Sequence, residues 1–315
     1  MTDRLEQAKN LLFSNKSIAI LTLLIACFVF SFAPIFIKWS EREIDAISTV
    51  FVRFFIGTLV FSLGSCIDLQ DNQKSDTKLM DFKFYSLRIF LFLLGAGVCT
   101  IANQTFWALS IVQTNIGNSA FMHSLSPLFT TSFAWLFLGR GINRQFFVGM
   151  VIAIGGSISI AMGDLQIATA KLQGDGLALI SAIFFAIYLL IVERLRIYLS
   201  ANSIMFWRCL LGSLLLFPIL LLSGSKILPD SQSGWLAVFC LCASFSIGQG
   251  LLAHTLKILS SNLVAVILLL EPLLSTIQAW IFFAETLSIS EWLSFIIVIV
   301  GVYLAISSHD RQVTE

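Results

Sequence analysis

Residues 48–57 read STVFVRFFIG, and residues 203–212 read SIMFWRCLLG. Serine, phenylalanine, arginine and glycine recur in register, so Arg53 matches Arg208 at an offset of 155 residues. A second pair, PLFTTSFAWLFLGR (127–140) and PLLSTIQAWIFFAE (272–285), shares proline, threonine, alanine and tryptophan at an offset of 145. Leucine and phenylalanine matches are common in an apolar chain, but aligned proline, tryptophan and arginine are not. The pattern therefore predicts that the chain is a duplication.

The composition around these stretches is that of an integral membrane protein. Of the 315 residues, 57% are hydrophobic and 12% are charged, and the mean hydropathy is +0.92, far above that of soluble domains. The net charge of +1 gives no indication of a nucleic-acid partner. Only Arg53, Arg208 and Glu271 among the 19 basic and 18 acidic residues fall inside apolar runs. Ten runs are long enough to be membrane spans: 17–37, 46–67, 89–108, 116–139, 145–163, 176–192, 201–222, 235–256, 259–283 and 292–307.

Each copy holds five runs, and an odd number places the second copy upside down relative to the first. The fold class is thus predicted as all-α, with ten transmembrane helices in two inverted five-helix repeats, a plan used by secondary transporters. The predicted parts are an N-terminal segment 1–16, a first repeat 17–163, a connector 164–175, a second repeat 176–307 and a tail 308–315. Thirteen lysines and arginines lie in loops on the N-terminal side and four on the opposite side. Positive loops mark the cytoplasmic side, so we expect both termini in the cytoplasm and a multi-pass protein of the plasma membrane.

Two prolines are expected to break spans and to turn them toward an interior. Proline removes a backbone hydrogen bond and displaces the carbonyl four residues earlier, so Pro272 is expected to free the carbonyl of Leu268, and Pro127 that of His123. A free carbonyl at membrane depth cannot face lipid. Polar residues follow the same helices at helical spacing, as Glu271, Ser275 and Gln278 do at i, i+4 and i+7.

We predict one polar cavity for the substrate, lined by these stripes and by polar residues of neighbouring spans. The alternative is that serine, threonine and asparagine side chains only join helices to each other. The candidate substrate-binding residues are Glu271, Ser275, Gln278, His123, Ser126, Asn103, Trp107, Gln249 and Tyr188.

The charged residues inside the spans have separate interpretations. Arg53 and Arg208 lie roughly 10 Å into their helices and are interpreted as structural or gating residues whose long side chains reach toward the head groups. Their repeat-related positions place Arg53 in the outer half of the membrane and Arg208 in the inner half. Glu271 is costly in a span unless it is protonated, paired or hydrated. It could bind a substrate ammonium group, carry a proton, or pair with His123 or an arginine.

These features resemble the EamA-type branch of the drug/metabolite transporter superfamily. The resemblance rests on ten spans in two halves, on the FxRxxxG pattern at 51–57 and 206–212, and on the proline-led helices ending at Gly139-Arg140 and Ala284-Glu285. Family members often have Gly-Glu at that last position, and neither copy keeps it. The resemblance implies the fold and a transport function. It leaves the substrate open, because members move amino acids, nucleotide-like metabolites, cofactors or cationic drugs.

The predicted function is a secondary transporter of small polar metabolites, an exporter of amino acids or related molecules, working by alternating access. Its partners would be a small-molecule substrate, the lipid bilayer and protons as a candidate coupling ion, with no nucleic acid; monomer and homodimer both stay open. Rival interpretations are a channel, a non-transporting membrane scaffold or an intramembrane enzyme. An enzyme would need a catalytic pair or a metal motif such as HExxH, and one glutamate with scattered histidines does not supply it. We therefore expect no catalysis, no metal site and no cofactor.

Overall fold

The computed structural model describes residues 2–40, 42–72, 87–114, 116–162, 172–223, 226–283 and 289–312. These residues form thirteen α-helices, and no strand occurs among them. Eight segments are long and apolar enough to cross a membrane, and two shorter apolar helices cover 126–138 and 144–159. Each of these ten segments overlaps one of the ten apolar runs in the sequence. The chain is a multi-pass membrane protein.

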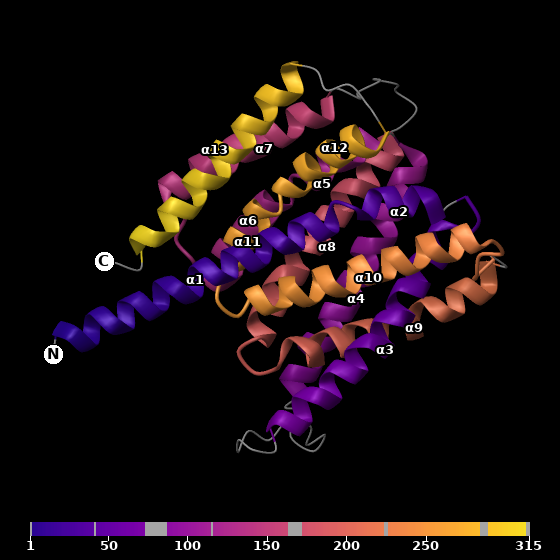
Figure 1. Cartoon of the computed structure of the whole chain (residues 1–315), viewed down its shortest axis with the longest axis horizontal. Helices are drawn as coiled ribbons and strands as arrows, with labels where there is room; N and C mark the ends of the chain where they lie inside the picture. Colours follow the sequence, from indigo (N-terminus) through magenta and orange to yellow (C-terminus); the bar gives the residue numbers. More distant parts are fainter. Residues whose placement is uncertain are drawn as a thin grey trace.

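The helices follow one another along the chain in the order drawn in Figure 1. They are α1 (Thr2–Phe30), α2 (Ala33–Ser40), α3 (Ala46–Asn72), α4 (Leu87–Gln113), α5 (Ile116–His123), α6 (Ser126–Leu138), α7 (Arg144–Met162), α8 (Leu172–Leu195), α9 (Ala201–Ser223), α10 (Gln232–Thr255), α11 (Ser261–Ile267), α12 (Leu270–Phe283) and α13 (Ile289–Gln312). The start of α1 and the end of α13 lie at the same end of the molecule.

Three of the apolar runs contain a broken helix. The breaks separate α1 from α2, α5 from α6 and α11 from α12, and each lasts two residues. Pro34, Pro127 and Pro272 each lie within the first turn of the helix that follows the break. Proline fits there because the first turn of a helix leaves its N–H groups without helical partners. The first break was not among the expected ones.

The expectation that Leu268 presents a free carbonyl is wrong. The main-chain N–H of Glu271 donates to that carbonyl at 3.0 Å. The two-residue turn allows this short-range bond, because the residue before the proline still carries an N–H that can reach back three positions. The break therefore redirects the chain without leaving this group unpaired.

Helices α3 and α9, which carry the repeated FxRxxxG pattern, cross in close contact. A methyl group on Gly57 would lie 2.9 Å from Sγ of Cys209, and one on Gly212 would lie 2.9 Å from Cγ of Phe54. Phe54 matches Cys209 and Gly57 matches Gly212 at the same offset of 155 residues. The contact is thus reciprocal, as in an interface formed around a two-fold axis.

Helices α7 and α13 pack side by side with the same reciprocity. A methyl group on Gly156 would lie 2.8 Å from the main-chain nitrogen of Val298, and one on Gly301 would collide with the main chain of Ala153. These residues match at an offset of 145, as Gly156 with Gly301 and Ala153 with Val298. Small residues allow this close approach, which is how helices associate within a bilayer.

The starts of α3 and α9 are capped in the same way. An oxygen of Asp45 accepts the N–H of Ser48 at 2.9 Å, and the hydroxyl of Ser200 accepts the N–H of Ser203 at 3.1 Å. A side-chain oxygen that accepts from the third residue onward is the usual cap of a helix N-terminus. Asp45 and Ser200 are again 155 residues apart, so the repeat extends to the capping chemistry.

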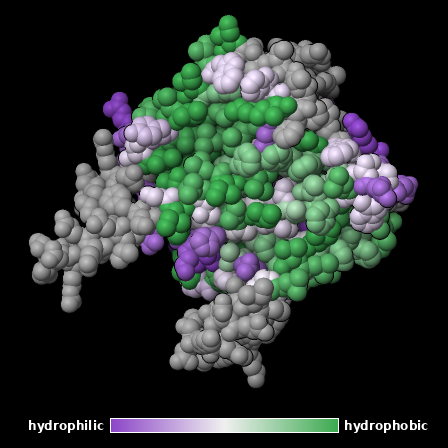
Figure 2. Space-filling model, viewed as in Figure 1, coloured by the Kyte–Doolittle hydropathy of each residue, from purple (hydrophilic) through white to green (hydrophobic). Residues whose placement is uncertain are grey.

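The outside of the molecule is apolar over a broad band, and Figure 2 shows hydrophilic residues mostly toward its margins. Large apolar side chains remain exposed along this surface, including Leu63, Phe137, Leu222 and Ile281. In a membrane protein such side chains face lipid, which is as apolar as they are.

Candidate functional site

Arg208 of α9 is the largest side chain that is fully buried, with 1% of its surface exposed. Its Nη1 donates to the hydroxyl of Tyr188 on α8 and to Oε1 of Gln249 on α10, both at 2.6 Å. Tyr188 also donates to Gln249 at 3.3 Å. We call these three residues the Arg208 group. The sequence indicated Tyr188 and Gln249 as substrate-binding candidates, and the structure joins them to the arginine.

The Arg208 group carries a positive charge that no described carboxylate balances. Nε and Nη2 of Arg208 are buried and have no hydrogen-bond partner among the described residues. The guanidinium carbon lies 5.0 Å from the ring centres of Tyr188 and Phe245 and 5.9 Å from that of Phe54. Aromatic faces attract a cation, but they replace only part of the hydration that it loses on burial.

Arg53 lies beside the same ring as Arg208. Its guanidinium carbon is 5.6 Å from the centre of Phe245, and only 4% of its surface is exposed. The interpretation of both arginines as residues that reach toward the head groups is therefore wrong. The crossing of α3 and α9 explains the difference, since it brings the two repeat-related positions toward α10 in the interior.

An aromatic row leads from the Arg208 group toward α5. The ring of His123 lies 5.3 Å from that of Phe185 and 6.4 Å from that of Trp107. Phe185 in turn lies 6.2 Å from Tyr188. His123 and Trp107, both predicted to contact substrate, thus lie close to each other and are linked to Tyr188 through a residue that carried no signal in the sequence.

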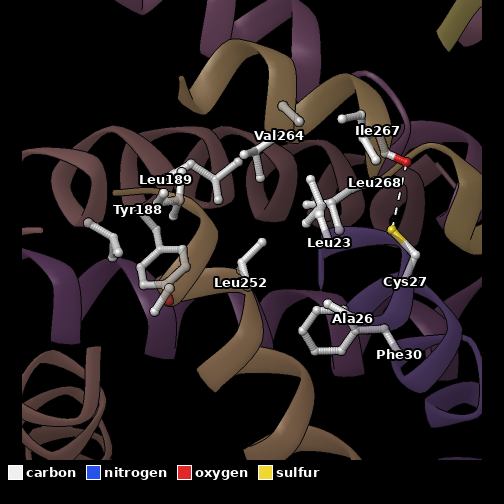
Figure 3. Packing of buried hydrophobic residues seen from close by; sticks show 14 of the residues in the cluster. Leu23, Ala26, Cys27, Phe30, Tyr188, Leu189, Leu252, Val264, Ile267 and Leu268 are labelled. Atoms are coloured by element: carbon white, nitrogen blue, oxygen red, sulfur yellow. Dashed lines mark hydrogen bonds between the residues drawn. The ribbon is translucent and has the colours of Figure 1, made fainter. Parts of the chain in front are cut away.

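Glu271 lies apart from the Arg208 group, in the first turn of α12. The break just before α12 faces α1, because Sγ of Cys27 donates to the carbonyl of Ile267 at 3.7 Å. Within the described part of the chain, no ion pair involves Glu271. In Figure 3, Leu252 and Leu23 lie between Tyr188 and Cys27, and both leucines are fully buried.

Two of the other predicted residues, Gln278 and Asn103, form hydrogen bonds between helices. Nε2 of Gln278 donates to the hydroxyl of Ser31 at 2.7 Å, at the break between α1 and α2. Nδ2 of Asn103 donates to the carbonyl of Ser181 at 3.1 Å. Ser126 is buried at the start of α6, and Ser275 is half-buried on α12. Asn103 follows the alternative interpretation, in which a polar side chain joins two helices.

The described contacts join four of the candidates, His123, Trp107, Tyr188 and Gln249, around Phe185 and Arg208, and one cavity lined by all nine candidates stays a prediction. The Gln278–Ser31 bond instead joins α12 to the break between α1 and α2. Helical spacing had aligned these residues along their own helices, but it carries no information about which neighbouring helix each stripe faces. Across the described ranges, no group of three or more histidine, cysteine, aspartate or glutamate residues is placed to hold a metal ion.

A salt bridge that the sequence analysis did not predict joins the two halves at one end of the bundle. Arg140, after α6, donates to both oxygens of Glu193 on α8 at 3.0 and 2.7 Å. Glu193 also accepts the N–H of Ser261 at the start of α11, at 3.2 Å. All three residues belong to loops or helix ends expected on the cytoplasmic side, and this shared side is the signal that could have predicted the contact.

The opposite end has a corresponding polar contact. Glu43, between α2 and α3, accepts the N–H groups of Asp230 at 3.0 Å and Ser231 at 3.1 Å and also bonds to the Ser231 hydroxyl. The Ser231 hydroxyl, followed by the two amides, holds the pKa of Glu43 below its ordinary value of 4.5. A carboxylate beside the N-terminus of α10 is also favoured by the helix dipole.

The sequence model of the EamA-like transporter family matches this chain twice, at residues 17–162 and at residues 172–307. The chain belongs to the EamA-like transporter family. Together, the two matches cover nearly all of the sequence.

Similar proteins agree with this assignment. An "Uncharacterized transporter" of Archaeoglobus fulgidus is 23% identical over 297 residues, which cover 92% of this chain and 98% of that protein. The "Uncharacterized transporter YxxF" of Bacillus subtilis is 21% identical over 305 residues, covering 96% of this chain and 94% of that one. A solved crystal structure matches with a TM-score of 0.76 at 17% identity and covers 92% of this chain and 97% of its own. That structure shares the fold of this EamA-like transporter.

Proposed function

We propose that this EamA-like transporter exports small polar metabolites, amino acids or related molecules, across the plasma membrane by alternating access of two inverted five-helix repeats. The observation that carries the proposal is the Arg208 group, a buried cation with unused hydrogen-bond donors inside the bundle. Charged residues inside membrane proteins are costly and mark substrate or ion pathways.

The reciprocal helix contacts support the inverted arrangement. Contacts between α3 and α9 and between α7 and α13 each repeat when the residues are exchanged for their equivalents in the other half. The family model also matches the chain as two consecutive segments, 17–162 and 172–307. Related halves that meet around a common axis can rock against each other and expose a site to one side at a time.

The polar contacts at the two ends are candidates for the gates. Arg140 belongs to the first half and Glu193 to the second, and at the other end Glu43 of the first half meets Ser231 of the second. If the halves rock, each contact must open in turn. Because the side chains of Arg140 and Glu193 keep part of their surface exposed, the net energy of their salt bridge is small, about 1 kcal/mol or less, which suits a contact that forms and breaks during a cycle.

Cross-linking of the Arg140–Glu193 contact tests the alternating access. Arg140→Cys and Glu193→Cys are introduced together after replacing all six native cysteines, and the purified protein is reconstituted into proteoliposomes. Exchange of a mixture of labelled L-amino acids is then measured before and after treatment with a short, cleavable bifunctional thiol reagent. We expect the reagent to stop the exchange and a reducing agent to restore it.

A matched control uses a contact that lies within one half. The hydroxyls of Ser200 and Ser203 lie 2.9 Å apart within the second half, so cross-linking cysteines at these two positions joins no two moving parts. Exchange should continue there. Undiminished exchange after complete cross-linking of positions 140 and 193 would contradict the proposal that the halves separate at this contact.

A further inference from the structure

We propose that the free edge of the Arg208 guanidinium binds a carboxylate group of the transported molecule. The inference rests on the transport function proposed above and adds the chemical group that a substrate must carry. It gives Arg208 a role in recognition instead of the structural or gating role that its spacing in the sequence indicated.

The pattern of used and unused donors at Arg208 matches a carboxylate. Tyr188 and Gln249 both bond to Nη1, while Nε and Nη2 have no partner within the described residues. The N–H groups of Nε and Nη2 point in parallel from one edge of the planar guanidinium group. Two parallel donors bind the two oxygens of a carboxylate in a fork-to-fork arrangement. Sδ of Met205 also accepts from Nη1, at 3.4 Å, so all three protein contacts hold one corner of the guanidinium and leave its bidentate edge unused.

The charge of the site favours the same group. Arg208 is 1% exposed, and among the described residues it forms no ion pair. Removing a charge from water without a counterion is unfavourable, and a partner of opposite charge offsets much of that cost. One carboxylate would neutralise the charge of Arg208.

The aromatic rings around Arg208 link binding to the arrangement of the two halves. Phe54 belongs to α3 in the first half, whereas Tyr188, Phe245 and Arg208 itself belong to the second. Nε and Nη2 are enclosed in this conformation, so a ligand reaches them only after a ring or a helix moves. Separation of α3 from α9 would move Phe54 away from the guanidinium and open the edge to a carboxylate.

Glu271 does not form part of this site in the observed arrangement. It follows the break at which the Ile267 carbonyl accepts from the Cys27 thiol, and the buried Leu252 and Leu23 lie between Cys27 and Tyr188 in Figure 3. The carboxylate and ammonium groups of an α-amino acid are attached to the same carbon atom. Because two parallel donors of Arg208 are unused and match a carboxylate, the carboxylate is the group that this site can anchor.

Thermal unfolding of the purified protein in lipid nanodiscs tests the inference. The probes are the common L-amino acids and short 2-keto and 2-hydroxy acids, each compared with its primary amide, which keeps the shape and loses the charge. Inorganic phosphate at the same ionic strength is the control for any anion. We expect at least one acid to raise the unfolding temperature in a saturable manner, while its amide and phosphate do not.

Two variants assign the effect to Arg208. Arg208→Lys keeps a cation but loses the forked edge, so we expect roughly tenfold or greater weakening of acid binding. Gln249→Glu places a carboxylate beside the guanidinium and should also weaken acid binding, even if the lysine variant does not fold. Arg196→Lys is the matched control, because Arg196 is buried but donates to the main-chain carbonyls of Ala253 and Leu199. It should bind the acid as the unchanged protein does.

The outcomes distinguish failure of the carboxylate site at Arg208, called the anchor below, from failure of the proposed transport function. The inference is overturned if no acid stabilises the protein, if the amide or phosphate stabilises it equally, or if acid binding survives both changes at the Arg208 group. Counterflow of an uncharged or cationic compound without acid binding would leave the transport function standing and remove the anchor. Acid binding that requires Arg208, without counterflow of that acid, would support the anchor and contradict the transport function.

Discussion

Adding one methyl group to α7 by Gly156→Ala should lower the stability of the protein, whereas Gly155→Ala, at the adjacent position, should not. A Cβ at Gly156 would lie 2.8 Å from both the main-chain nitrogen and Cγ2 of Val298, whereas a Cβ at Gly155 would have no neighbouring atom within 4 Å. Ordinary contact begins at 3.4 Å, so α7 and α13 must separate by about 0.6 Å to admit the methyl group. Because the obstacle is main chain, no side-chain rotation removes it.

The magnitude follows from comparing the two variants. Glycine to alanine in a helix gains up to about 1 kcal/mol from backbone propensity at either position, so this term cancels in the difference. What remains is the overpacking at Gly156→Ala, about 1–3 kcal/mol. Gly156→Ala should therefore unfold at a lower temperature than Gly155→Ala.

Unfolding of both variants is followed by tryptophan fluorescence in the same lipid nanodiscs. Equal unfolding temperatures for the two variants would refute the close approach of α7 to α13, and with it one of the two reciprocal contacts on which the inverted arrangement rests. A lower unfolding temperature for Gly155→Ala than for Gly156→Ala would mean that the face of α7 that carries Gly155, and not the one that carries Gly156, packs against α13.

Three further outcomes are expected. Glu271→Gln should leave counterflow intact but abolish substrate accumulation driven by a pH gradient, because a carboxylic acid apart from the Arg208 group can carry a proton. Weaker substrate binding at every pH would instead indicate that Glu271 binds the substrate. Glu43→Gln should lower the unfolding temperature at pH 7. The difference from the unchanged protein should shrink as the pH falls below 4.5, because a carboxylate with a lowered pKa stabilises the fold above its unfolded pKa and loses that effect on protonation. An unchanged difference at pH 3 would exclude a charge effect. Cysteines introduced near residue 76 and at the C-terminus should resist membrane-impermeant thiol reagents in intact cells, and one near residue 171 should react; labelling at residue 76 from outside would reverse the orientation.

The positions of the helices were predictable from hydrophobicity alone. Every apolar run of the sequence holds a helix, because a chain in a bilayer must satisfy its backbone hydrogen bonds within each segment. The prolines at 127 and 272 also indicated where two helices break. Pro34 breaks a third helix and was missed because no polar stripe accompanies it.

The contacts of Arg208 were not predictable in the same way. Its repeat with Arg53 was visible in the sequence, but burial depends on the crossing of α3 with α9 and on acceptors from α8 and α10. A single sequence gives the face of a residue on its own helix and not the helix that lies opposite. The two end contacts escaped for a related reason, since Arg140 and Glu193 are 53 residues apart and only their shared side of the membrane connects them.

Counterflow in proteoliposomes tests the central claim most directly. Vesicles that contain the purified protein are loaded with an excess of the acid that stabilises it most in nanodiscs, and the same labelled acid is added outside at a low concentration. A carrier with one site exposed alternately to each side predicts transient accumulation of label, saturation with external acid and loss of both in Arg208→Lys. Entry of label that rises linearly with concentration and does not depend on the internal acid would contradict the account and indicate a channel.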